Sequence, residues 1–79
     1  MNPPLDRVTA TVCRVGGLPT VGADDDFYAA GFSSVRSLEL LLELETEFGV
    51  SVPDDAFIAA RTPAAVAALV SRLQTEGSP

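Results

Sequence analysis

Apolar residues along this chain recur at steps of three and four positions, which is the spacing of one face of an α-helix. Four stretches have this spacing, and turn-forming residues separate them. No stretch alternates apolar and polar residues as a half-buried strand would. The pattern predicts three main helices and one short helix, over residues 4–15, 34–48, 54–60 and 63–75. We therefore predict an all-α fold, a small four-helix bundle that forms one domain over residues 1–79.

Residues at the ends of these stretches support the bounds. Gly16-Gly17 and Gly49 follow the first and second stretches, and glycine commonly follows the last residue of a helix. Thr62-Pro63 suits the N-cap and the first residue of the last helix. The other predicted N-caps are Asp54-Asp55 for the short helix and Ser33 for the second helix.

The apolar positions also predict a core and a packed loop. The expected core consists of Val8, Val12, Leu38, Leu42, Phe48, Ile58, Val66 and Leu69. Residues 16–33 form a long connection, which in a compact domain is usually functional or disordered. This connection carries apolar anchors, so we expect it to pack over the bundle through Leu18, Val21, Phe27 and Phe32. Within it, Asp24-Asp25-Asp26 is expected to cap a short turn that ends in Phe27-Tyr28.

The second helix has one apolar side and one acidic side. The side expected to be apolar holds Val35, Leu38, Leu41, Leu42 and Glu45, and is widened by Leu40 and Leu44. The acidic side holds Glu39, Glu43 and Glu47 at steps of four, where like charges repel each other by a few tenths of a kcal/mol per pair. A solvated face would usually mix lysine into such a row, and the chain has none. We therefore favour a docking surface over plain solubility.

Composition narrows the classes of partner. The chain has 79 residues and a net charge of −6, which argues against nucleic acid and against an anionic membrane surface, and favours a partner protein with a basic patch. Cys13 is the single cysteine, and neither a signal peptide nor an 18-residue apolar run is present, so we expect a reducing cytoplasm. We also expect a monomer. Basic residues that are all arginine, together with many alanines and valines, hint at a GC-rich bacterial genome.

Two adjacent serines, Ser33 and Ser34, open the second helix. The Ser34 hydroxyl would lie at the positive end of that helix, where backbone N–H groups favour a phosphate. The chain has no histidine, no nucleophile elbow and no phosphate loop with a lysine, so we expect no catalytic residue. No metal site is expected either, because the twelfth position from Asp24 is Val35, which excludes an EF-hand. On residue type alone, an ordinary helix cap would explain the two serines.

A set of short motifs in a fixed order changes this interpretation. They are Asp26-Phe27-Tyr28-x-x-Gly31, Gly31-Phe32-Ser33-Ser34-Val35, Glu39-Leu40, Glu45-Thr46-Glu47-Phe48-Gly49, Val52-Pro53-Asp54-Asp55 and Thr62-Pro63. The set covers nearly the whole chain and resembles the acyl and peptidyl carrier proteins. These are the four-helix domains that bear phosphopantetheine in fatty-acid, polyketide and nonribosomal-peptide synthesis.

The resemblance implies that a phosphopantetheinyl transferase attaches 4'-phosphopantetheine from coenzyme A to Ser34. The arm would then carry acyl or aminoacyl thioesters between a loading enzyme and downstream synthase enzymes. The aromatic residues at 27, 28 and 32 lean toward a polyketide or nonribosomal-peptide pathway. The implied neighbours of the arm are Gly31, Phe32, Ser33 and Val35. The implied docking residues are Glu39, Glu43, Glu47 and Arg36.

Two positions depart from the family pattern. Ser33 stands where the family usually has aspartate, and Arg36 is basic where acidic or neutral residues are common. Both changes weaken the negative charge beside Ser34, so we hypothesise a dedicated set of partners. The alternative is an acidic helical interaction module that docks without an arm. Met1 and the short tail after the last helix favour a free-standing protein, with an excised domain as the other option.

Overall fold

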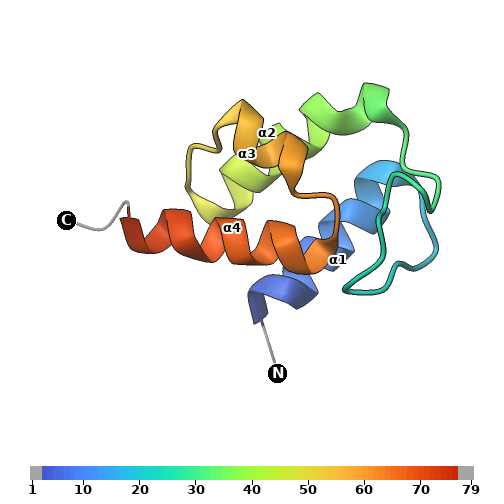
Figure 1. The fold of residues 1–79 in the computed structure, drawn as a ribbon, viewed down its shortest axis with the longest axis horizontal. Helices are drawn as coiled ribbons and strands as arrows, with labels where there is room; N and C mark the ends of the chain where they lie inside the picture. The colour runs from blue at the N-terminus through green and yellow to red at the C-terminus, as the bar shows by residue number, and fades with distance from the viewer. Residues whose placement is uncertain (1–2, 77–79) are drawn as a thin grey trace.

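The computed structural model describes residues 3–76, and these residues form helices and loops with no strand. The elements are α1 (Pro3–Gly16), the 3-10 turn η1 (Ser34–Arg36), α2 (Ser37–Phe48), α3 (Asp54–Ala59) and α4 (Pro63–Glu76) (Figure 1). The all-α prediction with three main helices and one short helix is confirmed. The predicted second helix is wrong at its start, because its first three residues form a 3-10 turn. Within residues 3–76, each helix is too short to cross a membrane.

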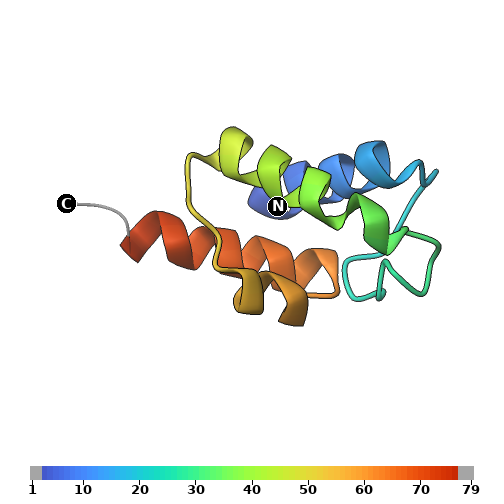
Figure 2. The same cartoon turned by 90° about the horizontal axis from the view of Figure 1, so that it is seen from above.

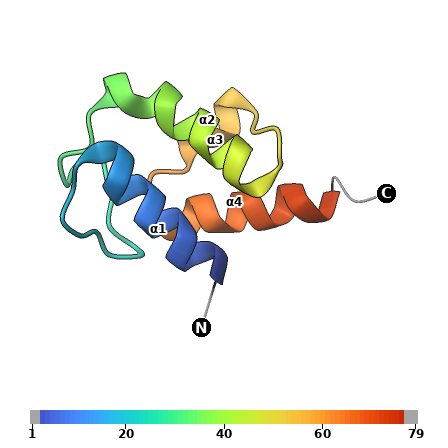
Figure 3. The ribbon, with the colours of Figure 1, turned by 180° about the vertical axis from the view of Figure 1, so that it is seen from behind.

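The helix packing is centred on α1 and α4. α1 makes its most extensive contact with α4 and a smaller one with α2, while α3 packs on α4. Seen from above, α2 lies beside α1 and α3 lies beside α4 (Figure 2). The connection between α1 and α2 wraps around one end of the bundle, and the C-terminal end of α4 lies at the other end (Figures 1 and 3). The start of α2 lies near this loop, and hollows separate it from α3.

The core differs from the predicted one on α2 and α3. Leu38, Leu42 and Ile58 are exposed, with 65%, 53% and 66% of their surface accessible. Their places in the core are taken by Leu40, Leu44 and Phe57, beside the correctly predicted Val8, Val12, Phe48, Val66 and Leu69. The reason is that α2 has two stripes that are equally apolar, one with Leu38 and Leu42 and one with Leu40 and Leu44. Periodicity detects both stripes, but only packing on α1 and α4 decides which one is buried.

The long loop packs over the bundle as predicted. Val21, Phe27 and Phe32 are buried, and Leu18 is half-buried against the core. Two backbone hydrogen bonds tie the loop to this end of the bundle. Phe27 N donates to the carbonyl of Arg61 in the connection between α3 and α4 (3.0 Å), and Ala64 N in the first turn of α4 donates to the carbonyl of Ala23 (2.9 Å). The predicted aspartate cap exists as a turn, in which Asp26 Oδ1 accepts from Tyr28 N at 3.0 Å.

The helix ends follow most of the predicted signals. Gly49 ends α2 with a φ of 65°, a conformation that side chains with a Cβ rarely adopt. Thr62 Oγ1 accepts a hydrogen bond from Ala65 N at 3.1 Å, as an N-cap does. The prediction for α3 is wrong by one residue, because Pro53 occupies the N-cap and the two aspartates lie inside the first turn. Asp55 Oδ1 there accepts from Ala56 N at 2.9 Å.

Candidate attachment site

A tight turn of the loop fixes the backbone just before Ser34. Phe32 N donates to the carbonyl of Phe27 at 2.9 Å, and Gly31 N donates to that of Tyr28 at 3.2 Å. Gly31 has a φ of 117°, which glycine adopts without strain. The Phe32 ring is buried, packs edge-on to Phe27 with centroids 5.3 Å apart, and lies so close to Gly16 that a Cβ there would collide with it. The predicted role of Phe32 as an anchor of the loop is confirmed, because its side chain is buried.

Ser34 is the first residue of the 3-10 turn, one turn before α2 begins. Ser33 precedes it in an extended conformation and occupies the N-cap position, although its side chain makes no capping hydrogen bond. The expectation that the Ser33 side chain caps the helix is therefore wrong. Ser34 is exposed, and no hydrogen bond within residues 3–76 occupies its hydroxyl. Ser37 differs, because its Oγ lies 3.2 Å from the Tyr28 hydroxyl and the residue is half-buried.

A surface groove begins at Ser34 and runs between α2 and α3. Its first part is a hollow of about 240 Å³ lined by Tyr28, Ser34, Ser37, Phe57, Ile58 and Arg61. A second hollow of about 210 Å³ continues it, lined by Ser37, Leu38, Leu41, Asp54, Phe57 and Ile58. The two hollows share three residues, so we treat them as one α2–α3 groove. Both parts have mainly apolar walls, and their charged residues are Arg61 in the first part and Asp54 in the second.

Arg61 stands at the Ser34 end of this groove and was not predicted as a site residue. Its Nε donates to Asp26 Oδ2 at 2.8 Å, and its Cζ lies 4.7 Å from the centre of the Tyr28 ring. The hydrogen bond from Arg61 is the main cause that lowers the pKa of Asp26, against a smaller opposing effect of burial. Asp26 and Arg61 are 35 residues apart, so no local sequence pattern could have shown that they pair.

Comparison with known proteins shows the family of this chain. The family described as phosphopantetheine attachment site matches the chain over residues 6–70. The chain belongs to this family. The resemblance to acyl and peptidyl carrier proteins is thus confirmed, and the alternative of an interaction module without an arm is not favoured. A comparison with curated protein sequences found no match.

Solved carrier structures have the same fold. The hexanoyl acyl carrier protein of the actinorhodin polyketide synthase from Streptomyces coelicolor matches with a TM-score of 0.76 and 24% identity, over 92% of both chains. The acetyl actinorhodin acyl carrier protein from the same organism matches with a TM-score of 0.67 and 26% identity, over 99% of this chain and 94% of that one. The helical bundle described above is therefore the fold of a carrier protein.

The acidic row of this carrier is mostly engaged within the molecule. Glu47 pairs with Arg7 at 3.1 Å, and Glu43 pairs with Arg14 at 3.0 Å, so both join α2 to α1. The buried Thr11 hydroxyl lies 2.7 Å from Glu47 Oε1, which accepts its hydrogen bond, and 2.9 Å from the Arg7 carbonyl, its second acceptor. We call these contacts the α1–α2 clasp. The hydrogen bond that Arg14 donates to Glu43 is the main cause that raises the pKa of Arg14.

The remaining two predicted docking residues pair with each other. Arg36 Nη1 lies 3.5 Å from Glu39 Oε1, and both side chains are more than half exposed. Neither of them belongs to the clasp. Of the four charged residues expected to dock partners, only Arg36 and Glu39 therefore lie outside an inter-helix contact.

Exposed apolar side chains surround the attachment site of this carrier. They are Val35, Leu38, Leu42 and Ile58, and Val35 is the most exposed of them at 86%. We call these four residues the apolar strip. Three of them follow one side of η1 and α2, while Ile58 faces the same groove from α3. Sequence reasoning placed three of the four in the core, so their exposure is a new finding.

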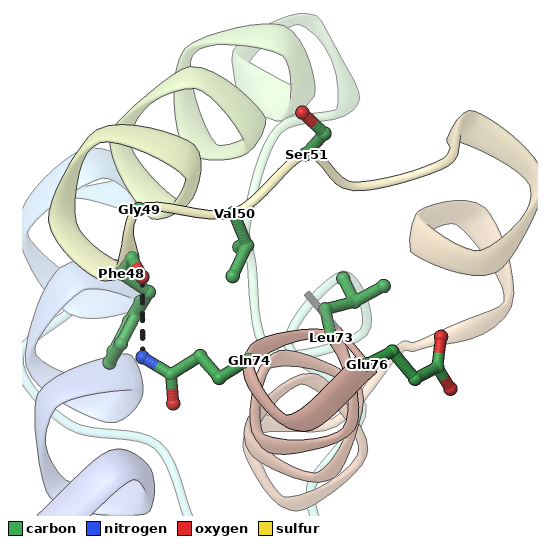
Figure 4. A pocket seen from close by; sticks show the side chains of 7 residues that line it. All are labelled: Phe48, Gly49, Val50, Ser51, Leu73, Gln74 and Glu76. Carbon is green, nitrogen blue, oxygen red and sulfur yellow. Dashed lines mark hydrogen bonds between the residues drawn. The ribbon is translucent and has the colours of Figure 1, made fainter. Parts of the chain in front are cut away.

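Another hollow, of about 520 Å³, lies where α2 ends (Figure 4). Residues 48–51 form one side of it, and Leu73, Gln74 and Glu76 of α4 form the other. Gln74 Nε2 donates to the Phe48 carbonyl at 3.2 Å across it. None of the predicted site residues lines this hollow, which lies at the opposite end of α2 from Ser34.

Proposed function

We propose that Ser34 carries the 4'-phosphopantetheine arm of this carrier. The observation that supports it most is the exposed Ser34 hydroxyl, which has no hydrogen bond within residues 3–76 and lies at the open end of the α2–α3 groove. Ser37 is a poorer candidate because its hydroxyl is within hydrogen-bond distance of Tyr28. Ser33 is exposed as well but does not line the groove.

The chemistry of attachment is a transfer of phosphopantetheine from coenzyme A by a separate transferase. The Ser34 Oγ attacks the phosphorus that bears the pantetheine, a new P–O bond forms, and the bond to the departing adenosine 3',5'-bisphosphate breaks. No acid or base contacts the Ser34 hydroxyl within the described residues, so the transferase must supply the base and the Mg²⁺. In this proposal the carrier has no catalytic residue of its own.

We infer acyl cargo of a polyketide-type pathway for the loaded arm. Both structural neighbours are acyl carrier proteins named from a polyketide synthase. Tethering raises the effective concentration of the cargo at each partner enzyme, which is the carrier's contribution to the pathway. Most residues that line the far part of the α2–α3 groove are apolar, in keeping with an acyl chain.

We further propose that partner enzymes dock on the apolar strip rather than on the full acidic row. Glu43 and Glu47 are committed to the α1–α2 clasp. The strip lies beside Ser34, where any enzyme that acts on the arm must approach, and Arg36 and Glu39 are the charged residues on its border. Exposed apolar side chains next to a functional site commonly mark a protein interface.

The attachment is tested by the intact mass after incubation with coenzyme A, Mg²⁺ and a broad-specificity transferase. We expect one phosphopantetheinyl group on the wild type and on Ser33→Ala, and none on Ser34→Ala. A mass increase that persists in Ser34→Ala and disappears in Ser33→Ala would show that Ser33 carries the arm. No gain in any of the three would refute the proposed attachment.

Docking is tested by the rate of that reaction at limiting transferase. Leu38→Asp changes an exposed residue of the strip, and Glu43→Gln is the matched control because it removes a charge of the clasp. We expect Leu38→Asp to slow the reaction about 10-fold or more, as loss of an interface anchor worth roughly 1.4 kcal/mol would. We expect Glu43→Gln to leave the rate within about twofold. The opposite order would return the docking role to the acidic row.

A further inference from the structure

A cation lies beside the attachment serine in a chain that is acidic overall. Arg61 and Ser34 line the same hollow of about 240 Å³, although the net charge of the chain is −6. The family pattern described above would add a carboxylate next to Ser34, but this chain has the uncharged Ser33 there. The residues around Ser34 therefore favour an anion more than the chain's composition suggests.

Arg61 is held in place by three contacts on different parts of the residue. Its carbonyl accepts from Phe27 N at 3.0 Å, its Nε donates to Asp26 at 2.8 Å, and its guanidinium lies 4.7 Å from the centre of the Tyr28 ring. Nε is the only nitrogen of the Arg61 guanidinium that donates a hydrogen bond to another described residue. The side chain is about half exposed, so Nη1 and Nη2 can still donate to a ligand.

We propose that Arg61 binds the phosphodiester of the arm once the arm is attached to Ser34. This inference rests on the proposed function. The two Nη groups would donate to the phosphate oxygens while Nε keeps its bond to Asp26, because one guanidinium can serve two anions on different edges. The contact holds the first atoms of the arm against the α2–α3 groove and biases the attached chain toward the groove over open solvent.

Arginine suits this role better than lysine would. A guanidinium is planar, so it can stay stacked on Tyr28 and still present a pair of N–H donors to a phosphate. The Asp26 contact fixes the Arg61 side chain before the arm is attached, so less conformational entropy is lost when the phosphate binds. Arg36 is the other arginine near Ser34 in the sequence, but it does not line the hollow that Ser34 and Arg61 share.

The test compares the phosphorus NMR signal of arm-loaded wild type, Arg61→Gln and Arg72→Gln, after the mass of each has confirmed loading. Arg72 is the matched control, because it is an exposed arginine of α4 paired with Glu76 and does not line the hollow. We expect Arg61→Gln to shift the phosphodiester signal and Arg72→Gln to leave it unchanged. The difference should disappear at about 1 M salt, where screening is nearly complete.

A second measurement uses the wild type alone, so it does not depend on how the variant folds. The Nε–Hε signal of Arg61 should shift when the arm is added, and that of Arg72 should not. If loading succeeds but neither the phosphorus signal nor the Arg61 signal responds as described, the contact is refuted and the proposed function stands. If no phosphopantetheine is added at all, the proposed function fails and this inference fails with it.

Discussion

Glu47 gives the sharpest prediction about what holds the carrier together. The change is Glu47→Ala, compared with Glu43→Ala one turn earlier on α2. Both glutamates pair with an arginine of α1, but their surroundings differ. The Glu47 side chain is 25% exposed and accepts from the buried Thr11 hydroxyl, whereas the Glu43 side chain is 39% exposed and pairs with Arg14 alone.

The magnitudes follow from these surroundings. A hydrogen bond to a charged, partly buried group contributes about 1.5–3 kcal/mol, while an exposed ion pair contributes roughly 0.2–1 kcal/mol. We therefore expect Glu47→Ala to lower the free energy of unfolding by about 2 kcal/mol and Glu43→Ala by less than about 1 kcal/mol. In a domain of this size, 2 kcal/mol corresponds to a fall in Tm of roughly 8–16 °C.

The assay is urea unfolding followed by circular dichroism, with Glu47→Gln as a third variant. Glutamine keeps an acceptor for Thr11 and removes only the charge, so its cost should lie between those of the two alanine variants. Equal losses for Glu43→Ala and Glu47→Ala would show that the Thr11 bond adds nothing. Little loss in either variant would refute the clasp itself and make both glutamates available again as docking residues.

Three further changes test other parts of the structure. Leu44→Ala removes a buried side chain and should cost about 2–5 kcal/mol in urea unfolding, whereas the exposed Leu42→Ala should stay within about 0.5 kcal/mol. Arg61 lowers the folded-state pKa of Asp26 below its ordinary value of 3.8, so this contact stabilises the fold above about pH 4 and is lost as the pH falls further. In urea unfolding at a series of pH values, the free energy of unfolding should therefore decline less steeply below pH 4 in Asp26→Asn than in wild type. The Ser33 side chain makes no capping hydrogen bond, so the carboxylate of Ser33→Asp should raise the free energy of unfolding by about 0.5–1 kcal/mol. The same variant should be modified faster by a generic transferase. Equal modification rates would remove the support for a dedicated partner set.

The helices of this carrier could be predicted because their signals are local. Glycine after α1 and α2, Thr62-Pro63 before α4 and the three-and-four spacing each lie within a few residues of the feature that they specify. The buried face of α2 could not be predicted in the same way. Leu38 and Leu42 form a stripe as apolar as that of Leu40 and Leu44, so the choice depends on packing partners far away in the chain.

The proposal that Ser34 carries the arm rests first on the resemblance, because an exposed serine before a helix is common. The ion pairs of the molecule could not be predicted from the sequence, because their partners are far apart in the chain. Glu47 and Arg7 are 40 residues apart, and Asp26 and Arg61 are 35 apart. A row of glutamates on one helix looks like a free acidic surface until the arginines of the neighbouring helix are placed against it.

These pairings change what the net charge of −6 means for function. If all acidic residues were free, partners would be attracted by a broad negative field, and association would weaken strongly with salt. In this carrier the clasp engages Glu43 and Glu47 with arginines of α1, and Arg61 engages Asp26, so these three carboxylates are not free to pair with a partner. The exposed side chains of the strip near Ser34 are apolar. It follows that partners of this carrier should be selected by the shape and apolar contacts of the strip, with charge contributing mostly to the speed of encounter.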